Sequence, residues 1–258
     1  MMTRIIAIAN QKGGVGKTTT AINLSHALAR LGRKVLLIDM DPQGNAGRGV
    51  GIDINIQENT IYEILSKRLT PTQAITTTGF DGLDVIPANL RLAQFEAEHN
   101  GTFSPFLTLK KALAHLPKNH YDYVIIDCPP SLGLLCLNAL VAADSVLIPV
   151  QCEYFAMEAV AAIISTVARV QHDMNPRLTI EGFLLTMYDQ RTTLGTEIQS
   201  QVRKTFKENT FLTVVPRNQS ISESQGRQEP VTTFRPTSQG ASAYFALARE
   251  VIDHNEKR

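Results

Sequence analysis

The stretch Ile8–Thr20 reads I-A-N-Q-K-G-G-V-G-K-T-T-T, and it decides the fold of this chain. The apolar run Ile5–Ala9 predicts a buried strand before the loop, and apolar residues at helical spacing through Leu31 predict a helix after it. A glycine-rich loop between a strand and a helix is typical of a phosphate-binding loop, whose backbone N–H groups and helix N-terminus bind phosphate oxygens. The sequence therefore predicts a nucleotide site near its start.

The loop departs from the usual pattern G-x-x-x-x-G-K-[ST], because Gln11 stands where the first glycine belongs and Lys12 precedes the usual Lys17. We expect Lys17 to reach the β- and γ-phosphates and Thr18 to bind Mg²⁺. Lys12 has two interpretations, a solvated loop lysine or a charge directed at phosphate from a partner subunit. The predicted nucleotide-binding residues of the loop are Lys12, Gly13, Gly14, Val15, Gly16, Lys17, Thr18 and Thr19.

Aspartates end two further apolar runs, Asp39 after Val35–Ile38 and Asp127 after Val124–Ile126. The carboxyl ends of parallel strands carry the phosphate site, so we assign Asp127 to the outer shell of Mg²⁺ and expect Asp39 to support the same region. Asp41, in the following turn, is the candidate for orienting the attacking water, because phosphoryl transfer requires mainly positioning and charge neutralisation. The alternative for each strand-end aspartate is a cap or turn former.

Composition limits the classes of function. The 258 residues include 25 Lys+Arg against 24 Asp+Glu, so a protein that coats nucleic acid over its whole surface is excluded and DNA binding requires a local patch. Three cysteines without C-x-x-C spacing indicate buried thiols and a cytoplasmic protein. The sequence shows no signal-peptide pattern and no apolar run long enough for a membrane span, so we expect no membrane association.

Short apolar runs alternate with helical patterns along the chain, which indicates parallel strands joined by crossover helices. We therefore predict an α/β fold, doubly wound around a mostly parallel sheet, as a single P-loop ATPase domain over residues 1–258. The expected strands are 5–9, 34–39, 83–87, 123–127, 145–150, 180–188 and 213–215. The expected helices are 17–31, 61–66, 90–99, 107–116, 132–142, 157–170, 195–206 and 240–254.

Six motifs together resemble the ParA/Soj family of deviant-Walker ATPases, which partition chromosomes and plasmids. They are K-G-G-V-G-K-T-T-T (12–20), D-M-D-P-Q-G-N (39–45), I-I-D-C-P-P-S-L-G (125–133), P-V-Q-C-E-Y (149–154), T-M-Y-D-Q-R-T (186–192) and P-R-N (216–218). The resemblance implies ATP and Mg²⁺ as cofactors, and adenine contacts at Pro216 and Asn218. It also implies a homodimer that encloses both nucleotides, in which Lys12 reaches the partner's phosphates and acts in catalysis with Lys17 and Asp41.

The resemblance further implies that the ATP-bound dimer binds DNA without sequence specificity, and that a ParB-type centromere-binding partner stimulates hydrolysis. The chain lacks basic residues that the family commonly has after P-R-N, with Ser220, Gln228 and Glu229 in that region. The candidate DNA-binding residues are Arg191, Arg203, Lys204, Arg217, Arg227 and Arg235. The alternative for these residues is a solvated helix face.

Three other functions were weighed. A MinD-like ATPase ends in an amphipathic membrane helix, whereas the apolar stripe within residues 244–252 predicts a helix that packs on the domain. An iron–sulfur ATPase requires a cysteine pair that bridges a dimer, and we expect Cys128, Cys136 and Cys152 to be buried structural thiols instead. A relative that positions a protein cargo instead of DNA stays open on the sequence.

Overall fold

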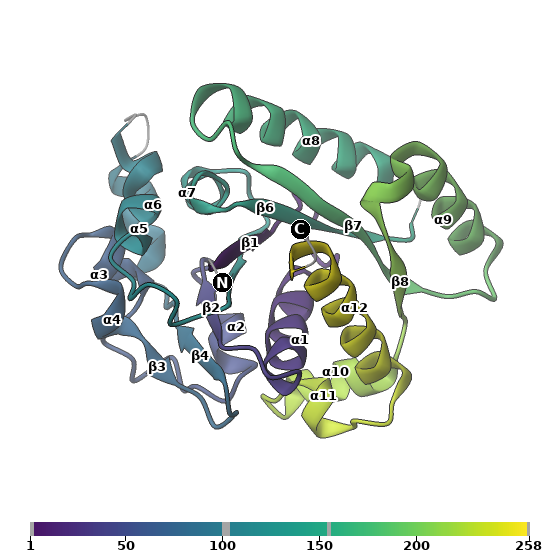
Figure 1. Ribbon diagram of the computed structural model, residues 1–258, viewed down its shortest axis with the longest axis horizontal. Helices are drawn as coiled ribbons and strands as arrows, with labels where there is room; N and C mark the ends of the chain where they lie inside the picture. The colour runs from purple at the N-terminus through teal and green to yellow at the C-terminus, as the bar shows by residue number, and fades with distance from the viewer. Residues whose placement is uncertain (1–2, 100–103, 154–155, 257–258) are drawn as a thin grey trace.

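The computed structural model describes residues 3–99, 104–153 and 156–256. Its centre is an eight-stranded sheet in the order β3-β4-β2-β5-β1-β6-β7-β8 (Figure 1). Every neighbouring pair is parallel except β3 with β4, which confirms the predicted α/β fold with a mostly parallel sheet. The strands are β1 (Arg4–Ile8), β2 (Val35–Asp39), β3 (Thr76–Thr77), β4 (Leu83–Ile86), β5 (Tyr123–Asp127), β6 (Ser145–Gln151), β7 (Thr179–Tyr188) and β8 (Thr210–Pro216).

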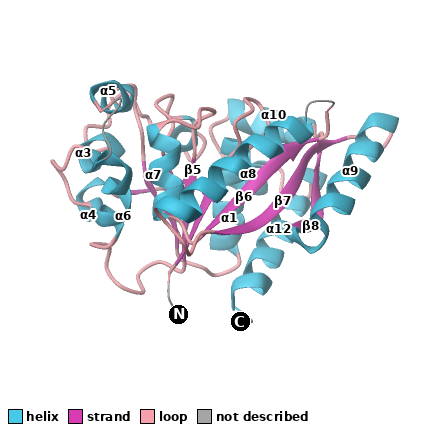
Figure 2. Ribbon diagram, turned by 90° about the horizontal axis from the view of Figure 1, so that it is seen from above, coloured by secondary structure: helices cyan, strands magenta, loops and turns pink. Residues whose placement is uncertain are grey.

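Helices cover both faces of the sheet (Figures 1 and 2). The α-helices are α1 (Lys17–Arg30), α2 (Asn45–Arg48), α3 (Ile61–Leu65), α4 (Pro71–Ala74), α5 (Leu92–Glu98), α6 (Thr108–Leu113), α7 (Leu134–Ala142), α8 (Ala156–Asp173), α9 (Thr193–Phe206), α10 (Gln219–Gly226), α11 (Val231–Phe234) and α12 (Gln239–Glu256). Short 3₁₀ turns occur at η1 (Ser104–Leu107) and η2 (Lys207–Asn209).

The central strands are buried on both faces, which explains their continuous apolar runs. Alternate residues point to opposite faces of the sheet. Leu36 and Ile126 join the core that includes α7 and α8, whereas Leu37 and Ile125 join the core that includes α1 and α12. The register of β2 with β5 pairs Asp39 with Asp127 at the carboxyl edge of the sheet.

The longer elements lie close to their predicted positions, and the shortest ones were missed. Strand β3 and helices α2, α4, α10 and α11 were not predicted, and β8 begins at Thr210 instead of Thr213. Four-residue helices such as α2 are too short to show a repeated apolar spacing. Helix α10 is longer, but it is mostly polar and depends on its cap, where the Asn218 side chain accepts a hydrogen bond from the Ser220 N–H at 3.1 Å.

The helix α12 packs on the sheet, as predicted, with Tyr244, Leu247, Ala248 and Val251 buried. Within the described ranges, no helix combines the length and apolar character needed to cross a bilayer. The expectation that residues 1–258 form a single domain stays a prediction.

Because the neighbouring strands from β2 to β8 run parallel, the loops that follow β1, β2, β5 and β8 all lie at one edge of the sheet.

Candidate nucleotide site

The loop between β1 and α1 forms an open cradle. Gly14 and Gly16 have φ angles of 76° and 89°, in the left-handed region that favours glycine. A Cβ added at Gly13 or Gly14 would meet no atom within 4 Å, so the space beside these backbone amides is open. The N-terminus of α1 follows directly and contributes partial positive charge. The loop therefore has the space and the polarity that a phosphate group requires.

Lys17 is held inside this loop. Its side chain is buried, and its Nζ donates a hydrogen bond to the backbone carbonyl oxygen of Lys12 at 3.1 Å. Burial lowers the pKa of Lys17, and the nearby carboxylates of Asp127 and Asp41 oppose that shift. The ammonium group therefore lies between the loop and the two strand-end loops, in the position expected of a phosphate-binding lysine.

Lys12 has a different environment. Its Nζ forms an ion pair with Glu153 Oε2 at 3.0 Å, and the two side chains are 28% and 50% exposed. An ion pair this exposed contributes about 1 kcal/mol or less to stability. Little free energy therefore opposes turning Lys12 toward another anion. Its predicted role toward a partner subunit stays a prediction.

Asp127 carries an unusual pair of oxygens. Its carboxylate is fully buried at the end of β5, and within the described part of the chain neither oxygen has a well-formed hydrogen-bond partner. Burial and then the charge of Asp39 raise the pKa of Asp127 well above its usual range, whereas the Thr18 hydroxyl and the Lys17 ammonium favour its charged form. A buried, unsatisfied carboxylate beside a phosphate cradle is suited to a hydrated cation.

The Asp39 carboxylate, in contrast, is fully engaged by backbone. Its Oδ1 accepts a hydrogen bond from the Asp41 N–H at 3.0 Å, and its Oδ2 accepts from Ala46 and Gly47 at 2.9 and 3.1 Å. Burial raises the pKa of Asp39 to about 7, although these three amides favour the charged form. Asp39 therefore holds the loop that carries Asp41 and starts α2. This geometry agrees with its supporting role, and its predicted contribution to the metal site stays a prediction.

Asp41 lies in the turn that Asp39 fixes. It is half-buried, and its Oδ1 accepts a hydrogen bond from the Gln43 N–H at 2.9 Å. Its charge is close enough to Lys17 to oppose part of the lowering of the Lys17 pKa that burial causes. The structure thus brings Lys17, Asp41 and Asp127 together at one edge, as the sequence predicted.

The residues at this edge fit Mg²⁺. Among the described residues, no three His, Cys, Asp or Glu side chains form a cluster that could enclose a metal ion. Mg²⁺ does not require such a cluster, because it retains several waters and is usually bound by one or two protein oxygens together with substrate phosphates. The Thr18 hydroxyl and the unpartnered Asp127 carboxylate supply oxygens of this kind.

A cavity of about 380 Å³ adjoins the loop between β8 and α10. Pro216 and Asn218, the predicted adenine contacts, line it together with Gly16 and Thr19. The volume is in the range of small-ligand pockets. A pocket of suitable size for a small ligand therefore adjoins the phosphate cradle. Its residues Pro216 and Asn218 lie about 200 residues further along the chain than the loop.

Sequence reasoning missed other residues around this pocket. Gln225 donates a hydrogen bond from its Nε2 to Thr19 Oγ1 at 2.7 Å, and Thr186 donates from its Oγ1 to the Val15 carbonyl oxygen at 2.9 Å. Met187 lines the pocket with a φ angle of 50°, a strained backbone of the kind found at binding sites. The motif T-M-Y-D-Q-R-T contains two of these residues and was a signal that could have placed them.

The candidate DNA-binding residues divide into two groups. Arg203 and Lys204 lie in the last turn of α9, near the amino end of β8, where Arg203 donates to the Leu212 carbonyl oxygen at 3.0 Å. Arg217 follows the opposite end of β8 and lines the nucleotide-side pocket. A strand of seven residues is about 20 Å long, so these groups lie well apart, as Figure 1 shows for α9 and α10.

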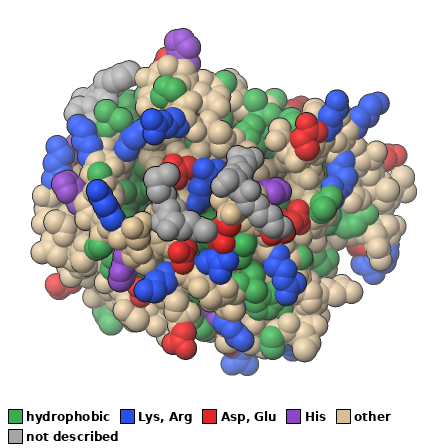
Figure 3. Space-filling model, in the orientation of Figure 1, with side chains coloured by type: hydrophobic (Ala, Val, Ile, Leu, Met, Phe, Trp, Pro, Cys, Tyr) green, Lys and Arg blue, Asp and Glu red, His purple; other side chains and the backbone are tan. Residues whose placement is uncertain are grey.

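Several of these cations are already paired. Arg191 binds Asp189 at 2.7 Å and lowers the pKa of that carboxyl to about 2, and Arg235 binds Glu223 at 3.1 Å. Arg227 is exposed, on the connection between α10 and α11. Basic and acidic side chains also alternate on the right of Figure 3, over α9. The six residues therefore do not form one continuous basic patch, and their role in DNA binding stays a prediction.

The cysteines are as predicted. Cys128, Cys136 and Cys152 are free and buried. Burial raises the pKa of Cys152 to about 11, so its thiol stays protonated at neutral pH. The last residue of the motif at 149–154 lies outside the described residues.

Comparisons with known proteins identify the family. Residues 3–180 match a family profile described as AAA domain. The chain is 50% identical to the sporulation initiation inhibitor protein Soj of Bacillus subtilis, over 97% of this chain and 98% of Soj. It is 46% identical to the chromosome partitioning protein ParA of Caulobacter vibrioides, over 99% of this chain and 96% of ParA.

Solved structures agree. A structure of cobyrinic acid a,c-diamide synthase from Mycobacterium smegmatis with bound ADP and magnesium is 38% identical, with a TM-score of 0.86 over 99% of this chain and 96% of that one. The cell division ATPase MinD of Pyrococcus furiosus is 28% identical, with a TM-score of 0.81 over 97% and 99%. The full-length identity to Soj and ParA, together with the site geometry, shows that this chain belongs to the ParA/Soj family of partitioning ATPases.

Proposed function

We propose that this protein is a Mg²⁺-dependent ATPase of the cytoplasm that segregates chromosomal or plasmid DNA by switching between a monomer and an ATP-bound dimer. The observation that carries the proposal is the contrast between its two loop lysines. Lys17 is buried inside its own phosphate cradle, whereas Lys12 is held at the rim by one exposed ion pair with Glu153. The weak, exposed pairing of Lys12 leaves its ammonium group able to turn toward another anion, which supports a role toward a partner's nucleotide.

In this proposal, different residues bind the phosphates, bind the metal ion and orient the water. The loop amides and Lys17 hold the β- and γ-phosphates, while Thr18 and Asp127 hold the hydrated Mg²⁺, which neutralises charge on those phosphates. Asp39 fixes the turn that carries Asp41, and Asp41 orients the water for attack. A Lys12 ammonium supplied by the partner adds positive charge in the transition state, an effect of roughly 10³–10⁵ in rate for comparable groups.

In this proposal the dimer binds DNA without sequence specificity and associates with the nucleoid, and a ParB-type centromere-binding partner stimulates hydrolysis and releases it. The test is an electrophoretic mobility shift on random duplex DNA with ATP, ADP or no nucleotide, across a salt series. We expect a shift with ATP alone that weakens steeply as salt rises. A shift that ignores the nucleotide, or no shift with ATP at low salt, would remove DNA from the function.

A protein cargo instead of DNA is a second candidate, and the pairing of Arg191 and Arg235 with acidic neighbours favours it. In that case ATP-dependent dimers form normally but do not bind DNA. A MinD-like membrane role has less support, because the apolar side chains of α12 are buried against the sheet. Liposome pelleting with ATP distinguishes it, since only a membrane-binding protein is recruited.

A further inference from the structure

A second cavity, of about 370 Å³, lies between α3–α4 and α6. It is on the other side of the molecule from the cavity lined by Pro216 and Asn218. Its wall includes four basic side chains from two separate segments, Lys67, Arg68, Lys111 and His115. Figure 3 shows lysine and arginine side chains gathered on the left of the view, over this part of the molecule. No role in ATP binding or hydrolysis accounts for this basic cavity.

The two lysines of the cavity keep their charge available. None of the described residues that line it is Asp or Glu, and neither Lys67 nor Lys111 forms an ion pair within the described structure. The acidic residue of α3, Glu63, is engaged elsewhere, because its carboxylate accepts from Thr60 Oγ1 at 2.7 Å and pairs with Arg91 at 2.6 Å. The described residues therefore leave the positive charge of these two lysines without an ion-pair partner.

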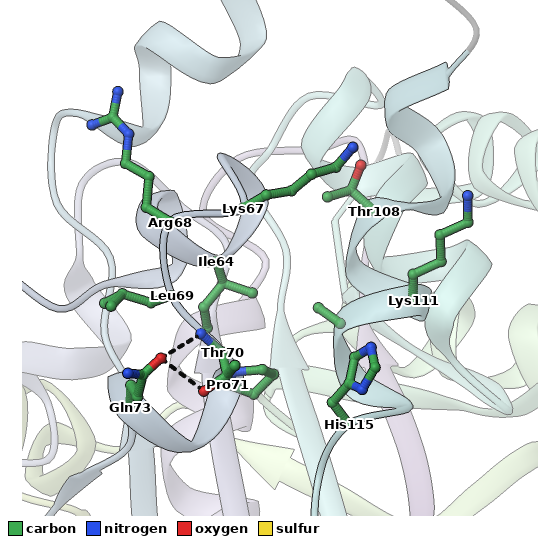
Figure 4. Close-up of a pocket in the computed structure, with 11 residues that line it drawn as sticks. Ile64, Lys67, Arg68, Leu69, Thr70, Pro71, Gln73, Thr108, Lys111 and His115 are labelled. Atoms are coloured by element: carbon green, nitrogen blue, oxygen red, sulfur yellow. Dashed lines mark hydrogen bonds between the residues drawn. The ribbon is translucent and has the colours of Figure 1, made fainter.

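The two lysines extend from opposite walls of the cavity (Figure 4). Lys67 extends from the end of α3 toward Thr108 at the start of α6, and Lys111 points to the same end of the cavity. Lys67 has a φ angle of 58°, unusual for a lysine, and the turn is held by its N–H bond to the Ile64 carbonyl oxygen at 3.0 Å. The turn therefore fixes the point on the cavity wall from which the Lys67 side chain extends.

We propose that this cavity binds a small anion that carries two or more phosphate groups. Lysine ammonium groups are compact point charges that bind phosphate oxygens. The arginine here, Arg68, points away from the other labelled residues and lies over the Tyr62 ring at 5.5 Å. No Phe, Tyr or Trp is among the described lining residues, so the ring of His115 is the one aromatic surface that the described lining offers a nucleobase.

The size of the cavity favours a small ligand over a DNA backbone. Its volume is in the range of small-molecule pockets, and its floor is built from the apolar side chains of Ile64, Leu69, Pro71 and Ala112. The four basic side chains of the cavity are exposed, so short duplex DNA is included as a probe in the test below. The inference does not depend on the proposed partitioning activity, because it uses none of the nucleotide-site residues.

The test uses pyrophosphate as the probe, in magnesium-free buffer, with the full chain. Calorimetry is done in a Lys17→Ala background, so that the phosphate loop does not contribute. We expect one bound pyrophosphate, and we expect Lys67→Asn with Lys111→Gln to weaken it by about tenfold or more. Asparagine tolerates the positive φ of position 67, so the turn is preserved. Lys110→Gln is the matched control, because this exposed lysine is on the same helix and does not line the cavity.

A second measurement in the wild-type protein keeps the test independent of that background. The ring resonances of His115 report on the cavity directly, and they should shift with pyrophosphate but not with citrate or short duplex DNA. Absence of any shift, an equal effect of citrate, or a shift with DNA alone would each overturn the proposal. An equal loss of affinity in Lys110→Gln would overturn it as well, because that result indicates only diffuse attraction.

Discussion

The carboxyl edge of the sheet, which carries the candidate nucleotide site and is called the nucleotide edge below, differs from the set of candidate DNA-binding residues in burial and pairing. At the nucleotide edge, Lys17, Asp39 and Asp127 are buried, and the strand register holds them within reach of one another. The basic side chains of α9–α11 are mostly exposed, and two of them, Arg191 and Arg235, are bound to acidic neighbours. A buried polar group needs a fixed partner, whereas an exposed one can exchange its partner for water at little cost. Substitutions should therefore act strongly at the first region and weakly at the second.

The largest effect is expected at Lys17. Lys17→Ala removes the buried ammonium from the cradle, so we expect ATP affinity to fall by about a hundredfold or more. Titration with a fluorescent ATP analogue measures this. Lys34→Ala is the control, because Lys34 is an exposed lysine at the amino edge of the sheet. Retained ATP affinity in Lys17→Ala would contradict the assignment of the cradle.

Substitutions of the two strand-end aspartates should differ clearly in their effect on the free energy of unfolding. Asp39→Ala leaves three backbone N–H groups, two of them in buried hydrogen bonds, without their acceptor, so we expect the free energy of unfolding to fall by about 2–4 kcal/mol without nucleotide. Asp127→Ala removes a buried carboxylate that has no well-formed partner within the described structure, so we expect a change within about 1 kcal/mol. Urea unfolding measures both.

Addition of Mg²⁺ and ATP sharpens the contrast between these aspartates. Mg²⁺ with ATP should raise the unfolding free energy of the wild type, and most of that increase should be absent in Asp127→Ala. Equal destabilisation by the two substitutions in the absence of ligand would show that Asp127 is structural and would remove it from the metal site.

His26 connects the two regions and makes the fold sensitive to acid. It lies on α1, and its Nδ1 and Nε2 contact the hydroxyls of Thr232 and Thr233 on α11 at 2.6 and 3.1 Å. Burial and then the charge of Arg30 lower the pKa of His26 to about 4 from 6.5. The unfolded chain therefore binds a proton in this window that the folded chain does not, so stability is complete above pH 6.5 and falls as the pH falls toward 4.

This shift corresponds to a loss of about 3 kcal/mol in unfolding free energy across the window. The measurement compares the pH dependence of urea unfolding in the wild type and in His26→Gln, where the contribution of this group is absent. Parallel pH profiles of the two proteins would show that His26 does not titrate as described.

The smallest effects are expected among the basic residues. Lys204 and Arg227 have no ion pair within the described structure, so each substitution to Ala should reduce the log–log salt slope of DNA binding by about 0.9 if that side chain contacts a phosphate. Arg191→Ala and Arg235→Ala should change it by less, because binding DNA first requires these arginines to leave Asp189 and Glu223. Mobility shifts across a salt series measure all four. Equal losses at the four positions would show that the intramolecular pairs are irrelevant.

The sequence predicted the nucleotide edge well because its signals are local. A strand, a glycine loop and a helix follow one another within residues 4–30, and Asp39 and Asp127 each end an apolar run. Both runs are parallel strands that end at the same edge of the sheet, so residues distant in the chain meet predictably there. The sheet, its parallel character and the position of Lys17, Asp41 and Asp127 followed from these patterns.

Features that depend on tertiary pairing did not follow from the sequence. Two of the three amides bound by Asp39, those of Ala46 and Gly47, come from a helix of four residues that carries no periodic signal. The hydrogen bond of Gln225 to Thr19 joins positions that only the fold brings together. In the same way, the pairing of Arg191 with Asp189 depends on side-chain direction, which residue spacing does not specify.

The central claim is that ATP closes two copies of this chain over a shared pair of nucleotides, with Lys12 exchanged between them. Light scattering on the Asp41→Ala variant with saturating Mg·ATP tests it most directly, alongside the same variant carrying Lys12→Ala. The account predicts the mass of a dimer for Asp41→Ala and of a monomer for the double variant. A monomer for Asp41→Ala, or a dimer that persists without Lys12, would contradict it.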